Sequence, residues 1–92
     1  MDAAAYLAAL RLEVDALDER IIVLLAERFE KTHAVGVIKA AIDEAPLNPE
    51  RQAHSAALWA SLALKHGLNT AFANALYHVI TLEVVNCHRR AV

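Results

Sequence analysis

The stretch of sequence that decides the fold spans residues 4–41 and reads AAYLAALRLEVDALDERIIVLLAERFEKTHAVGVIKAA. Its apolar residues recur at alternating steps of three and four, which is the spacing of one face of an α-helix. These residues are Leu7, Leu10, Val14, Leu17, Ile21 and Leu24, followed by Phe29 and Val35. The pattern therefore predicts one long helix over the whole stretch.

Two further helices are predicted by short signals that follow this stretch. Asn48 and Pro49 form the N-cap and first-turn pair that opens a helix, so a second helix should run from Pro49 to about Lys65. Gly67 is expected to end that helix in a left-handed conformation, and Asn69 to cap a third helix reaching about residue 89. No strand pattern competes with these signals. We predict an all-α chain of three helices that forms a single domain over residues 1–92.

Composition and charge exclude several classes of function. The formal net charge of −2 lacks the basic balance that nucleic-acid binding usually needs. The single cysteine, Cys87, cannot form an internal disulfide, and no apolar run approaches the roughly 18 residues of a membrane helix. The five histidines include no pair four residues apart, so no metal site is predicted. We expect a cytoplasmic protein with no membrane or nucleic-acid partner and no cofactor.

The length of the first helix points to a second copy of the chain. A helix over residues 4–41 is about 57 Å long, whereas a compact globule of this size has a radius of gyration near 12 Å. The two shorter helices cannot cover its apolar stripe, and an uncovered stripe of that length finds a partner. The sequence therefore predicts an obligate homodimer with the long helices packed antiparallel about a two-fold axis.

Four cations occupy positions that suggest an anionic ligand. Arg28 interrupts the apolar stripe, and Lys39 lies eleven residues later, about 20° away on the same face. Arg11 lies about 25 Å before Arg28 and is turned by about 100°, so an antiparallel partner would have to deliver it. Arg51 follows in the first turn of the second helix. Convergent arginines suit a ligand with more than one carboxylate, although each cation alone is also compatible with an ordinary ion pair or a solvated charge.

These positions belong to a longer pattern that resembles the all-helical chorismate mutase family. The resemblance covers nearly the whole chain and is strongest from residue 10 to residue 51. It rests on Leu10-Arg11, Asp15-Ala16-Leu17-Asp18-Glu19-Arg20-Ile21-Ile22, Leu24-Leu25-Ala26-Glu27-Arg28, Val35-Gly36, Lys39 and Pro49-Glu50-Arg51. It implies an intertwined homodimer of three-helix chains that rearranges chorismate to prephenate for phenylalanine and tyrosine synthesis.

The resemblance also implies a role for each cation. Arg28, Lys39 and Arg51 of one chain and Arg11 of its partner would form one site. The three arginines would hold the two carboxylates of chorismate, and Lys39 would donate to the ether oxygen of the breaking bond. Such a concerted rearrangement needs no nucleophile, base or metal, because the site folds the substrate and stabilises the charge that grows on that oxygen.

Four positions depart from the best-known bacterial pattern of the family. Asn48 and Gln52 stand where acidic groups usually contact the ring hydroxyl, and both amides can still accept a hydrogen bond. Val84 replaces a small polar residue. His88 stands where a glutamine or glutamate usually makes the second hydrogen bond to the ether oxygen, although a histidine there also complements the end of a helix.

Three alternatives to the mutase stay open on the sequence. An isochorismate-pyruvate lyase would use the same scaffold and the same cations, and is the nearest competitor. Rearrangement of the 4-amino analogue of chorismate ranks last, because Asn48 and Gln52 offer no negative charge to a protonated amine. A non-catalytic helical dimerisation or regulatory module would keep the long helix but would not need Lys39.

Overall fold

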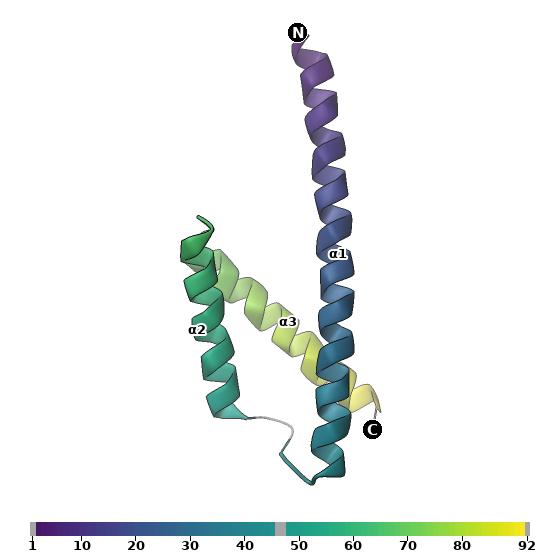
Figure 1. The fold of residues 1–92 in the computed structure, drawn as a ribbon, viewed down its shortest axis with the longest axis vertical. Coiled ribbons are helices and arrows are strands. Elements are labelled where there is room, and N and C mark those ends of the chain that lie inside the picture. Colours follow the sequence, from purple (N-terminus) through teal and green to yellow (C-terminus); the bar gives the residue numbers. More distant parts are fainter. Residues whose placement is uncertain (1, 46–47, 92) are drawn as a thin grey trace. The chain divides into compact units, whose positions relative to one another are not determined.

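The computed structural model describes the backbone of residues 2–45 and 48–91 and the side chains of residues 2–45 and 48–87. This part of the chain contains three α-helices and no strand: α1 (Ala3–Ala41), α2 (Pro49–Lys65) and α3 (Thr70–Ala91) (Figure 1). The predicted all-α, three-helix fold is confirmed, and α2 has the predicted bounds. That residues 1–92 form a single domain stays a prediction.

The ends of α2 and α3 are formed by the residues that the sequence indicated. The Asn48 side chain accepts a hydrogen bond from the Arg51 N–H at 3.1 Å, and the Asn69 side chain accepts one from the Phe72 N–H at 2.9 Å. Gly67 has a φ of 73°, and the N–H that follows it, from Leu68, donates to the Ala63 carbonyl at 2.8 Å. This is the left-handed helix stop in which glycine avoids a steric penalty.

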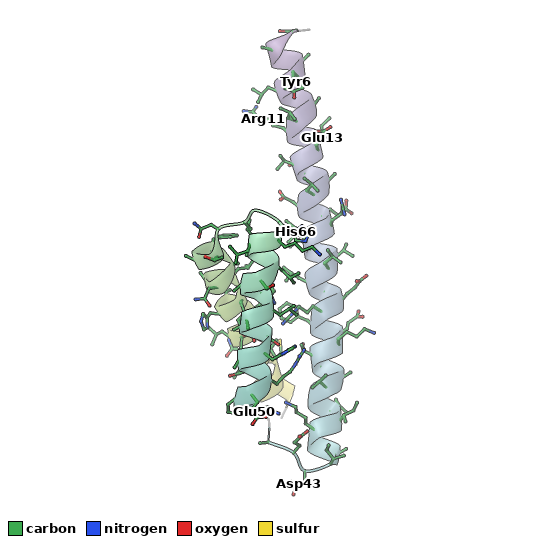
Figure 2. All side chains as sticks on the ribbon, turned by 60° about the vertical axis from the view of Figure 1, so that its left-hand side comes forward. Tyr6, Arg11, Glu13, Asp43, Glu50 and His66 are labelled. Atoms are coloured by element: carbon green, nitrogen blue, oxygen red, sulfur yellow. The ribbon has the colours of Figure 1, made fainter. Side chains whose placement is uncertain are left out.

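The end of α1 uses the same backbone geometry with a different residue. Asp43 has a φ of 58°, its N–H donates to the Ala40 carbonyl at 3.3 Å, and the Glu44 N–H donates to the Lys39 carbonyl at 2.8 Å. Aspartate enters the left-handed region more readily than most residues because its short polar side chain tolerates it. The turn after α1, where Figure 2 labels Asp43, is therefore a built helix stop.

The chain divides into two compact units, and the first of them is a helix without a core. It extends to Lys31 and contains most of α1, in which no residue is buried. The apolar stripe is open to solvent: Leu17, Ile21 and Leu24 are 51%, 54% and 59% exposed. A helix gains most of its stability from burying an apolar face. The stripe of α1 therefore requires a covering surface.

The second unit starts at Thr32, and its core lies between α2 and α3, which pack against each other. Ala63 from α2 is buried with Ala73, Tyr77 and Ile80 from α3. The rings of Trp59 and Tyr77 meet at 5.6 Å between centroids, in a tilted arrangement that aromatic pairs favour. This core is small, and large apolar side chains of the same unit stay exposed, among them Phe72, Val79 and Leu82.

Candidate active site

The half-buried residues of α1 form one stripe along its C-terminal part. Every other residue of this helix is exposed, so the stripe stands out from its surroundings. Its members are Leu25, Arg28, Phe29, Thr32, Gly36 and Lys39. Steps of three and four residues keep them within about 100° of one another around the helix. The two cations that the sequence placed on one face thus belong to the only part of α1 that is partly removed from water.

Partial removal from water makes Arg28 and Lys39 stronger partners for an anion than ordinary surface cations. The attraction between opposite charges grows as the effective dielectric constant falls, and it is smallest for pairs fully exposed to water. Arg28 lies in the first unit and Lys39 in the second, within the same continuous helix.

The helix stop at Asp43 fixes the backbone of Lys39. The Lys39 carbonyl accepts the Glu44 N–H, so the last turn of α1 is closed around this residue. Lys39 is also the basic residue of that turn, where the negative end of the helix dipole favours a cation. The local sequence therefore places Lys39 in a closed last turn of α1, next to the connection to α2.

The first turn of α2 brings three of the predicted site residues together. The Asn48 side-chain oxygen accepts the Arg51 N–H, and the Asn48 carbonyl accepts the Gln52 N–H at 3.0 Å. Asn48 and Gln52 are half-buried, whereas Arg51 is exposed. Backbone N–H groups and the positive end of the helix dipole make such a first turn favourable for a carboxylate. Arg51 adds a full positive charge at the same place.

The structure distinguishes the side-chain amides of Asn48 and Gln52, which the sequence did not. The Asn48 side-chain oxygen already serves as the N-cap of α2, which uses one of its two lone pairs. The Asn48 side-chain NH₂ group remains as its donor. Gln52 has no capping duty, so its side chain is the better acceptor for a hydroxyl. Sequence reasoning found the cap but treated the two amides as equivalent.

The predicted positions on α3 are described only in part. Val84 is half-buried. The Glu83 carboxylate, next to it in the sequence, accepts a hydrogen bond from the Cys87 thiol at 3.4 Å. The backbone of His88 lies within α3, but its side chain is outside the described residues. The role predicted for His88 therefore stays a prediction.

Arg11 lies far along α1 from Arg28, the other predicted cation of the first unit. It is exposed on the N-terminal part of α1, and Figure 2 shows its side chain projecting from the helix. The spacing of seventeen residues separates it from Arg28 by about 25 Å along the helix. Helix geometry thus keeps Arg11 from sharing a small ligand with Arg28 of the same chain.

The described residues contain neither a group of metal ligands nor a helix that could cross a membrane. No group of three or more histidine, cysteine, aspartate or glutamate side chains there is placed to hold a metal ion. None of the described helices is both long enough and apolar enough to cross a membrane.

Comparison with known proteins assigns the chain to a family. Residues 10–89 match the family model for chorismate mutase type II. The match covers most of the chain and contains every predicted site residue, from Arg11 to His88. The chain belongs to the chorismate mutase type II family, and the resemblance seen in the sequence is confirmed. No curated protein and no solved structure matches the chain.

Family membership settles the class of protein. The type II chorismate mutases are enzymes of the isomerase class, and the chain is an enzyme of this kind. The family assignment concerns the scaffold and the general activity. The preferred substrate and the part played by each residue are matters for proposal.

Proposed function

We propose that the protein rearranges chorismate to prephenate in a site made by Arg28, Lys39 and Arg51 of one chain and Arg11 of a second copy. The observation that carries the proposal is the partial burial of Arg28 and Lys39 in a single stripe of an otherwise exposed helix. Chorismate carries two carboxylates and an ether oxygen, so a face with several fixed cations complements both its ground state and its transition state. As part of this proposal, the reaction serves the cytoplasmic synthesis of phenylalanine and tyrosine.

The arginines act by binding and folding the substrate. The planar guanidinium group of arginine binds a carboxylate through two parallel hydrogen bonds. Arg28 and Arg51 hold carboxylates from helix α1 and from the first turn of α2, which adds its dipole. Holding both ends of the substrate in a compact conformation removes much of the entropic cost of the rearrangement.

Lys39 supplies the electrostatic part of catalysis. Negative charge develops on the ether oxygen as the carbon–oxygen bond breaks. A half-buried ammonium group stabilises this charge more in the transition state than in the ground state, and that difference accelerates the reaction. His88 is proposed as the second donor to the same oxygen, in its charged form.

The hydroxyl end of the substrate meets neutral groups in this proposal. Gln52 accepts from the ring hydroxyl, Asn48 contributes through its side-chain NH₂ group, and Val84 provides an apolar wall near the substrate carboxylate. The absence of charge in this pair of amides disfavours a substrate with a protonated amine, because an amide oxygen attracts a cation more weakly than a carboxylate does.

The second copy is proposed to cover the open stripe of α1. In the chain alone, the apolar residues of this stripe are exposed along the whole first unit. A two-fold antiparallel pair buries both stripes in one self-complementary contact and carries the N-terminal Arg11 of one chain to the C-terminal part of the other α1. Two equivalent sites result.

The reaction is tested by following chorismate absorbance with purified protein and identifying the product. The proposal expects stoichiometric formation of prephenate. Isochorismate is offered in a parallel reaction, because pyruvate release from isochorismate with no prephenate from chorismate would make the protein an isochorismate-pyruvate lyase. If the folded protein consumes neither compound, Lys39→Ala has no activity to remove. That result would favour the non-catalytic module.

A further inference from the structure

One face of α3 begins in the core and continues into the proposed site. Tyr77 and Ile80 are buried where α3 packs against α2. From Tyr77 onward, steps of four, three and four residues stay on one face of the helix. The residues reached by these steps are Thr81, Val84 and His88. Because Val84 and His88 belong to the proposed site, Thr81 lies on the face of α3 that carries the site.

Thr81 stands one turn before Val84 on this face. The two positions differ by about 4.5 Å along the helix axis and by about 60° around it. Side chains three residues apart on a helix are direct neighbours, so one small group can contact both. A carboxylate that lies against Val84, as the proposed function has it, is therefore close enough for a contact with the side chain at position 81.

The position of Thr81 is anchored by the neighbouring core. It follows the buried Ile80 directly, and Tyr77, one turn earlier, meets the Trp59 ring at 5.6 Å between centroids. A β-branched side chain in a helix also has few favoured rotamers. The hydroxyl of Thr81 is therefore held close to one position before a ligand arrives, which favours a specific polar contact.

The hydroxyl of Thr81 is available to a ligand. A threonine inside a helix often bonds the carbonyl four residues earlier, which here belongs to Tyr77. Within the described part of the chain, the Thr81 hydroxyl has neither this partner nor another hydrogen-bond partner, although the residue is half-buried. The side chain of Val84 has no polar atom. Thr81 thus offers, one turn away, the donor that Val84 lacks.

We propose that Thr81 is a substrate-binding residue whose hydroxyl donates a hydrogen bond to a carboxylate of chorismate. This inference rests on the proposed function, which places that carboxylate next to Val84. A hydrogen bond to a charged group is stronger than one between neutral groups. The carboxylate keeps its charge throughout the rearrangement, so the bond stabilises the ground state and the transition state equally. Thr81 therefore affects KM rather than kcat.

Thr81→Val tests the contact because it removes the hydroxyl and keeps the branched shape of the side chain. The KM for chorismate should rise about tenfold, as expected for the loss of one hydrogen bond to a charged group, while kcat stays within about twofold. Thr81→Ser keeps a donor and should stay within about threefold of the native KM. Urea unfolding of each variant at one protein concentration separates a binding defect from a folding defect.

Thr70→Val is the matched control for Thr81→Val. Thr70 is an exposed threonine at the first residue of the same helix, so its replacement should leave both KM and kcat at the native values. A double variant, Thr81→Val with Val84→Ser, moves the hydroxyl by one turn along the face. It should recover most of the affinity lost in Thr81→Val, because the two positions are direct neighbours.

Titration calorimetry with prephenate, which keeps both carboxylates, measures binding without turnover and separates the contact from the proposed function. Weaker prephenate binding by Thr81→Val than by Thr70→Val supports the contact, whether or not chorismate is consumed. An active protein in which Thr81→Val keeps the native KM, with kcat lowered or unchanged, refutes the contact and leaves the proposed function standing. A folded protein that neither consumes chorismate nor binds prephenate refutes both.

Discussion

Replacing Lys39 by alanine should abolish most of the activity while leaving the fold intact. In the proposed site the Lys39 ammonium group stabilises the ether oxygen in the transition state. Removal of one such preorganised donor typically lowers kcat by about 10²–10³-fold, or about 2.7–4 kcal/mol of transition-state stabilisation. The half-burial of Lys39 supports an effect of this size, because the charge acts in a medium less screening than bulk water.

The effect of the same change on stability is expected to be much smaller. Lys39 lies in the last turn of α1, where its charge contributes about 0.3–1 kcal/mol through the helix dipole. Alanine offsets part of that loss because it has the highest helix propensity. The hydrogen bond that closes the turn uses the backbone carbonyl of residue 39, so the substitution does not remove it. The net change in the free energy of unfolding should therefore stay below about 1 kcal/mol.

Lys65→Ala is the matched control for this experiment. Lys65 is also a lysine in the last turn of a helix, but it is exposed. Steady-state kinetics with chorismate and urea unfolding at one protein concentration should be measured for both variants. Lys65→Ala should keep its kcat. A Lys39→Ala protein that is as active as the native one, or whose lost activity is accounted for by unfolding, would refute the assignment.

Three further changes test other parts of the molecule. Gly67→Ala should lower the free energy of unfolding by about 1 kcal/mol in urea titration, because a Cβ there meets no atom within 4 Å and only the left-handed φ of 73° is penalised. Asn48→Ala should cost about 1 kcal/mol by removing the cap of α2, whereas Asn48→Asp should not; equal stability of the two variants would contradict the capping role. For His88, kcat/KM should fall as the pH rises from 5 to 8, because the charged donor is lost. His88→Gln should remove this fall, and a flat native profile from pH 5 to 8 would exclude a charged donor.

The helices could be predicted from the sequence because their signals are local. The Asn48-Pro49 pair and Gly67 fixed both ends of α2, and the repeat of Leu17, Ile21 and Leu24 indicated α1. The stop after α1 was less evident, because Asp43 adopts the conformation for which glycine is the usual signal. This turn is recognised from its backbone hydrogen bonds to the carbonyls of Ala40 and Lys39.

The candidate site was predicted only as far as one helix can define it. The common face of Arg28 and Lys39 follows from helix geometry, and both side chains are half-buried. The hydrogen bond from the Arg51 N–H to the Asn48 side-chain oxygen competes with a ligand contact at that oxygen. This competition depends on the geometry of the first turn of α2. The proposed contribution of Arg11 depends on a second chain, so it stays a prediction.

The central claim, a site shared between two chains, is tested most directly by mixing two inactive variants. Arg11→Ala and Lys39→Ala are purified separately, unfolded, combined in equal amounts and refolded together. In a mixed dimer, one site lacks both Lys39 and Arg11. The other site combines Lys39 of the Arg11→Ala chain with Arg11 of the Lys39→Ala chain. About half of the dimers are then mixed, and each has one intact site, so about a quarter of the native activity should return. If each chain used its own Arg11, every site in the mixture would lack one residue, and the absence of any recovered activity would contradict the account.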